Sequence, residues 1–512
     1  MRSLLAWAFA AVLLGAGGEA RAAWHEATTK HFIIYADDRP ERLKEFAERL
    51  ERFDRAVRYL RSMDDPQITD AQKLKIYALK SEGAVARLAG DSSVRGFYNA
   101  RASGAVAFVP RRAGSSDIWS LDTEAIFFHE YAHHLQLQFA SVALPAWVVE
   151  GFAEFFATAD INKDGSVLIG SVPMYRVYGI VTPGGITLEQ MVGETYRRLN
   201  DRERDSLYGN GWLLTHYLTF DSSREGQLSR YIDGIQSGKA ALDAAKAAFG
   251  DLKKLDHDVD RYRAKRLMGL RVPAKVLEIG PTAIRPLTPG ESAIMDVHIR
   301  STRGVNQKTA PGVAADARRI AAGFPNDPFV QAVLAEAEHD AGNYAASEAA
   351  ADRALAVDPK NVHALIYKGR DEMALAKEQP AKADWSKVRA WFVKANKLDT
   401  ENAEPLALFF RSYAEAGERP TKNAVEALLY SVDLAPQDGE LRVNAVQQLL
   451  RDGRVSEAKQ LFGPLAYAPH ATAEWRETNM KIMAAITAGD AKTALGLMDG
   501  AEKLAAAEAK KP

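Results

Sequence analysis

The chain contains no cysteine among its 512 residues. This absence excludes disulfide bonds and thiolate ligands, so any bound metal ion must be held by histidine or carboxylate side chains. The chain also lacks an excess of either charge, because its formal net charge is only −1. Such a balance argues against a basic surface for nucleic acid or for an anionic membrane. Hydrophobic residues make up 47% of the chain, which is enough to form the cores of about two or three domains.

The N-terminus has the three parts of a secretory signal. Arg2 supplies a positive charge, residues 4–14 form a short apolar run, and the sequence Ala-Arg-Ala at 20–22 matches a cleavage site. The run is shorter than the about 20 apolar residues that a membrane-spanning helix needs, and no later segment reaches that length. We therefore predict a signal peptide over 1–22 and a mature protein in the periplasm or outside the cell, without a membrane span.

The segment from residue 23 to 270 alternates between strand and helix patterns. β-Branched and aromatic residues before polar turns predict strands, and apolar residues spaced three and four apart predict helices. The next segment, 271–309, has several prolines and little pattern, so we expect a connecting region with a short strand at 293–299. Strands are expected at 30–36, 74–79 and within 96–109, a hairpin at 160–173, and helices at 40–62, 122–140, 146–157 and over most of 187–221 and 229–267.

From about residue 310 the chain becomes rich in alanine and helical spacing dominates. Helix ends are indicated near residues 325, 359, 400, 436 and 469, so the steps between them are 34, 41, 36 and 33 residues. A period near 34 residues with paired helices is typical of tetratricopeptide (TPR) repeats. We predict a TPR-like solenoid over 310–500 and a polar tail over 501–512; an irregular alanine-rich bundle is the alternative. Glycines fall where turns between paired helices are expected, at Gly417, Gly453 and Gly489.

The sequence His-Glu-Tyr-Ala-His-His at 129–134 has the spacing of a metal-binding helix. His129 and His133 are four residues apart and share one helix face, where both imidazoles can reach a single ion. Glu130 lies beside them and can act on a water bound to that ion, which is the HExxH pattern. His134 faces elsewhere and is not expected to be a ligand.

A third protein ligand is expected from the helix at 146–157, because a catalytic zinc site has three protein ligands and one open position. Glu150 is the candidate, sixteen residues beyond His133. Glu154 lies one turn further on the same face and is expected to accept a hydrogen bond from the far nitrogen of a ligand histidine. Both carboxylates sit among apolar residues, and a cation would offset the cost of burying them.

The run HEYAHH followed by PAWVVEGFAEFF resembles the gluzincin metallopeptidases, especially their aminopeptidase-N-like branch. The resemblance implies an α+β metallopeptidase domain over 23–270 that binds one Zn²⁺ ion. It implies that His129, His133 and Glu150 are the zinc ligands and that Glu130 is the general base.

A further part of the resemblance concerns Tyr208, in the sequence Tyr-Gly-Asn-Gly-Trp at 208–212. It implies that the Tyr208 hydroxyl stabilises the oxyanion of the tetrahedral intermediate. Apart from the resemblance, His216 is an alternative electrophile. The GxMEN motif that holds the amino terminus of aminopeptidase substrates is missing upstream of His129. The resemblance therefore does not decide between endopeptidase and exopeptidase activity.

Residues 160–165 match the start of a calcium loop, D-x-N-x-D-G. Residue 171 is serine where such a loop closes with glutamate, and an Asp-Gly hairpin turn explains the match more simply. We expect a hairpin, and a weak calcium site over 160–171 stays open.

The sequence as a whole predicts an α+β gluzincin-like metallopeptidase domain followed by an all-α TPR-like solenoid. The expected function is hydrolysis of peptide or protein substrates by a zinc-bound water, with the repeats binding a protein partner. A non-catalytic scaffold with a zinc-stabilised or relic peptidase domain is the first alternative. A zinc hydrolase of non-peptide amides, such as cell-wall material, is the second.

Overall fold

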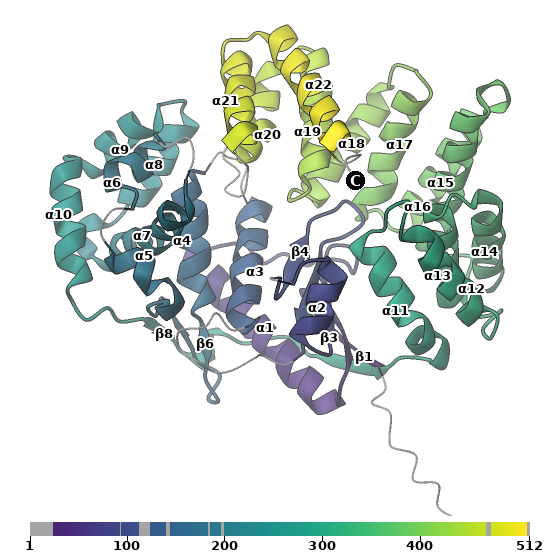
Figure 1. Cartoon of the computed structure of the whole chain (residues 1–512), viewed down its shortest axis with the longest axis horizontal. Coiled ribbons are helices and arrows are strands. Elements are labelled where there is room, and N and C mark those ends of the chain that lie inside the picture. The colour runs from purple at the N-terminus through teal and green to yellow at the C-terminus, as the bar shows by residue number, and fades with distance from the viewer. Residues whose placement is uncertain are drawn as a thin grey trace, which may run out of the picture.

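The computed structural model of the chain describes residues 24–92, 94–111, 123–139, 144–182, 185–195, 199–466 and 473–508. The predicted signal peptide at 1–22 lies outside these ranges. Across the described residues, no helix combines the length and the apolar character that crossing a bilayer demands. The chain is mostly helical, with one larger sheet near its N-terminus (Figure 1).

The larger sheet has six strands in the order β4-β5-β3-β2-β1-β9. Its three central strands are parallel, and the strands toward its edges are antiparallel to their neighbours. The strands predicted at 30–36 and 74–79 are confirmed, whereas β1 and the short helix α2 (Glu82–Ala89) were not predicted. The strands are β1 (Trp24–Thr28), β2 (Phe32–Asp37), β3 (Leu74–Leu79), β4 (Phe97–Asn99), β5 (Val106–Pro110) and β9 (Ala283–Pro286).

One face of this sheet packs on the helices that carry the candidate site. Ile34, Ile76 and Ala107 are paired in register and all are buried in the main core. Against them lie α1 (Pro40–Arg61) and α3 (Thr123–Phe139), whose apolar residues recur at helical spacing. The parallel strands and the covering helices explain why this part of the sequence alternates between the two patterns.

The opposite face of the sheet carries a row of stacked rings. Tyr35, Tyr77 and Phe108 stack on one another with ring centroids 5.4 Å apart. Met295 and Ile299 of the helix α11 (Pro289–Arg303) cover this row. Apolar rings of this size bury enough area to hold the first solenoid helix firmly against the sheet.

The strand predicted at 293–299 is wrong, because these residues belong to α11. Its N-terminus has a capping box, in which Thr288 and Glu291 each bond the other's backbone N–H. The helix is buried on two sides: Ile294 and Val297 enter the solenoid core, while Met295 and Ile299 face the sheet. Two buried stripes on one helix produce an apolar pattern that imitates the alternation of a strand.

The segment 271–309 was expected only to connect the two halves. It contains a strand of the N-terminal sheet and the first helix of the solenoid. β9 pairs with β1, and an Arg285–Glu26 ion pair at 2.7 Å joins the same two strands. α11 then begins the helix pairs before residue 310, where repeats were expected to start.

Helices fill the rest of the N-terminal half, together with a small second sheet. The predicted hairpin is confirmed, since β6 (Asp160–Ile161) pairs antiparallel with β7 (Val167–Ile169), which pairs with β8 (Leu270–Val272). The helix predicted at 146–157 has the same bounds in the structure. The helices are α4 (Ala146–Ala157), α5 (Val177–Val181), α6 (Leu188–Gly193), α7 (Asp201–Phe220), α8 (Gln227–Gln236), α9 (Ala241–Phe249) and α10 (Leu252–Arg263), with the 3₁₀ turn η1 (Met174–Arg176) before α5.

The C-terminal half consists of helix pairs that follow one another as an arc (Figure 1). The expected turn glycines at 417, 453 and 489 have φ angles of 67°, 73° and 75°, a left-handed conformation that glycine adopts without strain. α22 extends to Glu508, through most of the segment 501–512 that was expected as a tail. The pairs are α11 with α12 (Ala310–Ala321), α13 (Pro328–Asp340) with α14 (Tyr344–Val357), α15 (Val362–Glu378) with α16 (Trp385–Leu398), α17 (Ala403–Glu415) with α18 (Lys422–Leu434), α19 (Gly439–Arg451) with α20 (Val455–Ala466), and α21 (Ala473–Thr487) with α22 (Ala491–Glu508).

The loop between β4 and β5 joins the sheet to the solenoid. The backbone N–H of Ala102 donates to Asp438 Oδ2 at 2.7 Å, and the Ala102 side chain packs on the apolar cluster around Leu428. The Arg101 guanidinium donates to the carbonyls of Thr302 and Arg303, both at 2.8 Å. These contacts join residues about 200 to 340 positions apart in the chain and hold the two halves together.

Candidate metal centre

The candidate site lies between α3 and α4. On α3, Phe128 and Ala132 are buried in the core, which turns the neighbouring face with His129 and His133 toward α4. α4 is buried along nearly its whole length, and Glu150 on it has no exposed surface. Pro145 precedes α4 and accepts its first backbone hydrogen bonds, so the helix begins where the sequence predicts.

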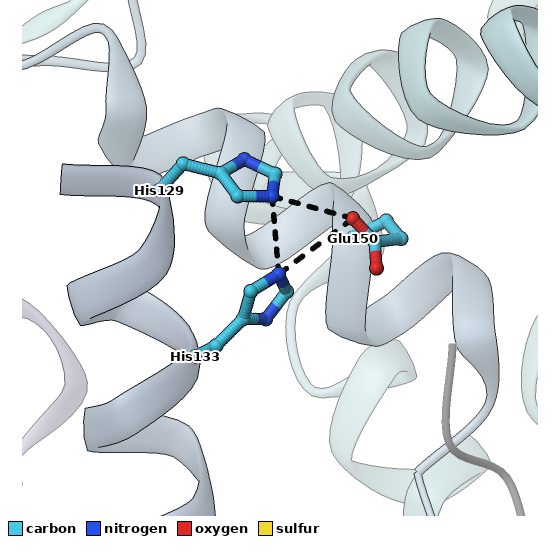
Figure 2. A group of neighbouring side chains, drawn as sticks. All are labelled: His129, His133 and Glu150. Carbon is cyan, nitrogen blue, oxygen red and sulfur yellow. Dashed lines mark hydrogen bonds and ion pairs between the residues drawn. The ribbon is translucent and has the colours of Figure 1, made fainter. Parts of the chain in front are cut away.

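The two imidazoles and one carboxylate point at a common centre (Figure 2). The Nε2 atoms of His129 and His133 are 3.1 Å apart. Glu150 Oε2 lies 3.5 Å from His129 Nε2 and 3.7 Å from His133 Nε2. The structure thus brings together the three residues that the sequence predicts as metal ligands.

The size and chemistry of this triangle fit a zinc ion. A tetrahedral zinc site with bonds of about 2.0–2.1 Å has edges of about 3.3–3.4 Å between neighbouring ligand atoms. The three observed edges are 3.1, 3.5 and 3.7 Å, so they lie on both sides of this range. Two imidazole nitrogens and one carboxylate oxygen also form a donor set typical of catalytic zinc sites, which leaves a fourth position open.

The charges in the group favour a bound cation. Burial alone would raise the pKa of Glu150, but the charge of His133 and a hydrogen bond from His129 hold it well below its usual value. Burial alone would lower the pKa of His129, but Glu150 and Glu154 raise it. The carboxylate is therefore ionised, and protons on the imidazoles would compete with a metal ion.

Glu154 lies where an orienting carboxylate is expected, but its strongest partners are different ones. Glu154 Oε1 is 3.6 Å from His129 Nδ1, which is longer than a normal hydrogen bond. Arg176 Nε donates to the same oxygen at 2.9 Å, and the Tyr175 hydroxyl donates to Oε2 at 2.8 Å. Sequence reasoning missed Tyr175 and Arg176, because η1 has no motif and follows both helices of the candidate site only after a hairpin.

Tyr208 on α7 stands beside the first histidine. Its ring lies parallel to that of His129, with an interplanar angle of 9° and centroids 6.2 Å apart. The Arg176 guanidinium also lies over the Tyr208 ring, 4.6 Å from the ring centroid. Burial and the nearby charge of Glu150 raise the pKa of Tyr208, so its phenol keeps its proton and can donate a hydrogen bond.

A close crossing of α4 and α7 positions Glu150 and Tyr208 in the same site. A Cβ atom at Gly151 would lie 2.4 Å from the Gly211 carbonyl oxygen and 2.6 Å from Thr215 Oγ1. Only glycine allows the two helices to approach this closely. Gly151 directly follows Glu150, so the crossing sets the position of that carboxylate.

The predicted general base, Glu130, follows His129 on α3 and is half-buried. Its charge acts on His129 and on Tyr98 of the edge strand β4. Glu130 therefore lies near the first candidate ligand, on the helix that carries both histidines.

The two remaining histidines of interest are core residues. His134 Nδ1 is 2.8 Å from the Tyr98 hydroxyl, and burial together with the charge of Arg58 lowers its pKa to about 3. His216 Nδ1 is 2.8 Å from the Tyr262 hydroxyl, and burial lowers its pKa to about 4. Neither belongs to the group around Glu150.

A second group of histidine and carboxylates is an ionic network rather than a metal site. His31 Nδ1 lies 2.9 Å from Glu51 Oε2 and 3.3 Å from Asp54 Oδ2. Asp54 is also bonded by Arg58 Nε at 2.8 Å and by the Tyr131 hydroxyl at 2.7 Å. A guanidinium already neutralises the charge that would bind a cation.

In the hairpin after α4, Asp164 Oδ1 accepts hydrogen bonds from the Ser166 backbone N–H at 2.9 Å and from its hydroxyl at 2.6 Å. This carboxylate oxygen closes the turn, as the hairpin interpretation predicts.

Comparisons with known proteins give limited results. No protein family profile matches the chain, and no curated protein matches it. Among solved structures, a thermophilic TPR protein of Thermus thermophilus is similar at 17% identity, with a TM-score of 0.31 over 37% of this chain and 97% of that one. PilF of Pseudomonas aeruginosa is similar at 16% identity, with a TM-score of 0.32 over 42% of this chain and 91% of the other. Yeast Tom70 is similar at 15% identity, with a TM-score of 0.26 over 61% of this chain and 68% of Tom70. Because all three TM-scores are below 0.5, these likenesses assign neither a fold nor an activity. The TPR-like interpretation therefore depends on the helix pairs of the chain itself.

Proposed function

We propose that this chain is an exported zinc metallopeptidase, in which the helical repeats bind a protein partner. The observation that carries the proposal is the convergence of His129, His133 and Glu150 into a triangle with the edges of a zinc site. A zinc ion held there would lower the pKa of a water molecule to about 7 and polarise a substrate carbonyl.

The residues around the triangle match the steps of amide hydrolysis. Glu130, half-buried beside the first ligand, takes a proton from the attacking water and delivers it to the leaving nitrogen. Tyr208, whose phenol stays protonated, donates a hydrogen bond to the developing oxyanion. Arg176 lies over the Tyr208 ring and is itself held by Glu154, whose carboxylate is also close to His129.

A non-catalytic scaffold is the second candidate, and the helix pairs from α11 to α22 favour it. Stacked helix pairs present an extended inner surface that suits protein segments. The comparisons do not support a peptidase. The peptidase proposal therefore depends on the geometry of the site alone.

The Glu130→Gln variant separates the two candidates. We expect both proteins to bind one zinc ion, measured by metal analysis, and only the wild type to cleave a mixture of unfolded proteins. Loss of a positioned general base reduces the rate by roughly 10²–10⁴-fold. Glu189→Gln, an exposed glutamate on α6, is the matched control and should keep full activity. Equal inactivity of wild type and variant at full zinc occupancy would favour the scaffold.

A further inference from the structure

A polar cavity lies between the sheet and the inner helices of the solenoid, separate from the candidate metal centre. Its walls come from β3, the loop before β5, and the helices α11, α13, α15 and α17. Its volume is about 310 Å³, at the lower end of the ~300–1,000 Å³ that small-molecule sites usually have. None of these elements carries a predicted zinc ligand.

The charges of the lining residues balance. Three basic and three acidic side chains line the cavity together with His298 and His363, so a bound ligand finds groups of both signs there. A small molecule that carries one charge of each sign matches this lining. The basic residues are Lys75, Arg101 and Arg370, and the acidic ones are Glu336, Asp340 and Glu404.

Several of these charges already have protein partners. Arg370 pairs with Glu404, and Glu336 Oε2 lies 3.2 Å from His363 Nε2. Lys75 differs: burial lowers its pKa, and the carboxylates of Glu404 and Glu336 act on it only from a distance, without an ion pair in the described chain. Among the described residues, Lys75 and Arg101 both lack a carboxylate partner, but Arg101 already donates to two backbone carbonyls, which leaves Lys75 as the cationic side chain open to a bound carboxylate.

Uncharged polar groups in the same wall also lack partners. Among the described residues, Ser301 Oγ and His298 Nδ1 on α11 are buried and have no hydrogen bond. His298 Nε2 is 3.0 Å from the Tyr77 hydroxyl, which fixes its ring and leaves Nδ1 available. Water could satisfy these two atoms, but water would not neutralise Lys75.

We propose that this cavity binds a small zwitterion of amino-acid or dipeptide size. Its carboxylate would meet Lys75 and Ser301 on the side of the sheet, and its ammonium would meet Glu336 and Asp340 on α13. Because the ligand contacts both halves of the molecule, its binding would stabilise their association. The inference does not depend on the proposed peptidase activity.

The test uses isothermal titration calorimetry on the full mature chain carrying Glu130→Gln, after metal removal with EDTA. This background prevents hydrolysis and removes binding through a metal ion. The probes are L-alanine, L-alanyl-L-alanine, its N-acetyl form and its C-terminal amide. We expect at least one of the two zwitterions to bind, and both blocked dipeptides to bind at least about tenfold more weakly, because each lacks one charge.

Substitutions then locate the binding. Lys75→Met and Asp340→Asn should each weaken the zwitterion at least about tenfold, whereas Lys360→Met, an exposed lysine in the solenoid, should not. Ser301→Ala serves in place of Lys75→Met if circular dichroism shows that the latter does not fold. The proposal is overturned if neither zwitterion binds at about 10 mM, or if binding survives the cavity substitutions unchanged.

Discussion

Tyr208 illustrates how a single side chain is prepared for one chemical role. Its ring contacts both the His129 ring and the Arg176 guanidinium, and its raised pKa keeps the phenolic proton in place. Neither contact depends on the hydroxyl group, so phenylalanine can keep the ring in position. The hydroxyl can therefore be tested without removing the ring that supports His129.

In the proposed peptidase, Tyr208→Phe should lower kcat by roughly 10²–10³-fold and leave KM within a factor of about three, since the lost hydrogen bond forms only in the transition state. Zinc content should stay at one ion per chain. Steady-state kinetics on a fluorogenic peptide measure this effect. A variant with wild-type kcat would show that another group stabilises the oxyanion.

His31 carries a pH dependence that belongs to the fold rather than to catalysis. Burial alone would lower the pKa of His31, but the charges of Asp54 and Glu51 raise it above 6.5. The histidine ion pair thus stabilises the fold fully below pH 6.5, and this stabilisation is lost as the pH rises through the folded-state pKa. Glu51 has a lowered pKa and stays ionised above pH 5.

The His31→Gln variant should be less stable than the wild type by about 3 kcal/mol at pH 5.5, because it removes the cationic partner of the buried Glu51 carboxylate. The difference should shrink between pH 6.5 and 9, as the wild-type imidazole loses its proton. Urea unfolding at several pH values measures both quantities. A difference that stays constant over this range would mean that His31 is neutral in the folded protein.

Among elements, the crossing of α4 and α7 decides where the third candidate ligand, Glu150, lies. Gly151 and Gly211 face one another at this crossing, and the space holds no further methyl group. The sequence places Glu150 on a helix with the correct bounds. How closely that helix packs on α7 depends on one glycine in each of the two helices.

Gly151→Ala should destabilise the protein by about 1–3 kcal/mol and reduce zinc affinity, because the added methyl group pushes α4 away from α7. Gly312→Ala is the matched control, since a Cβ atom there meets nothing within 4 Å in the helix α12. That substitution should be neutral or slightly stabilising. Thermal unfolding and zinc titration compare the two variants, and equal behaviour would argue against a tight crossing.

The comparison of α4 with α11 shows which elements can be predicted. α4 begins after Pro145 and has a continuous apolar face, so local pattern alone predicts its bounds. α11 packs on the sheet with Met295 and on the solenoid with Ile294, and such double burial removes the single stripe that identifies a helix. The two candidate histidine ligands could be predicted because residues four apart share one face of any helix. Arg176 has no such spacing from the histidines, so the sequence did not indicate it.

At the scale of the whole molecule, the loop between β4 and β5 occupies the inner surface of the solenoid. Residues 100–104 line the cavities formed by α15, α17 and α19, and Ala102 bonds Asp438. A protein partner that used this part of the inner surface would have to displace the chain's own segment. Such displacement would pull on β4, whose Tyr98 bonds His134 next to the candidate ligand His133.

Ala102→Glu should therefore loosen the two halves, because it places a carboxylate in an apolar contact beside Asp438. We expect a larger radius of gyration in small-angle scattering and faster proteolysis between the halves. Ala346→Glu, on an exposed face of α14, is the matched control and should change neither. An unchanged radius with Ala102→Glu would show that the aromatic contact with α11 is sufficient to hold the halves together.

The sequence by itself determined the types of the candidate ligands, the shared face of His129 and His133, and the period of the helix pairs, because each depends on neighbours within a few turns of one helix. The tertiary structure alone decided that Glu150 meets both imidazoles, that Arg176 covers Tyr208, and that Ala102 lies in the solenoid. These distances join segments far apart in the chain, so they depend on how closely whole elements pack, and no local pattern records that packing.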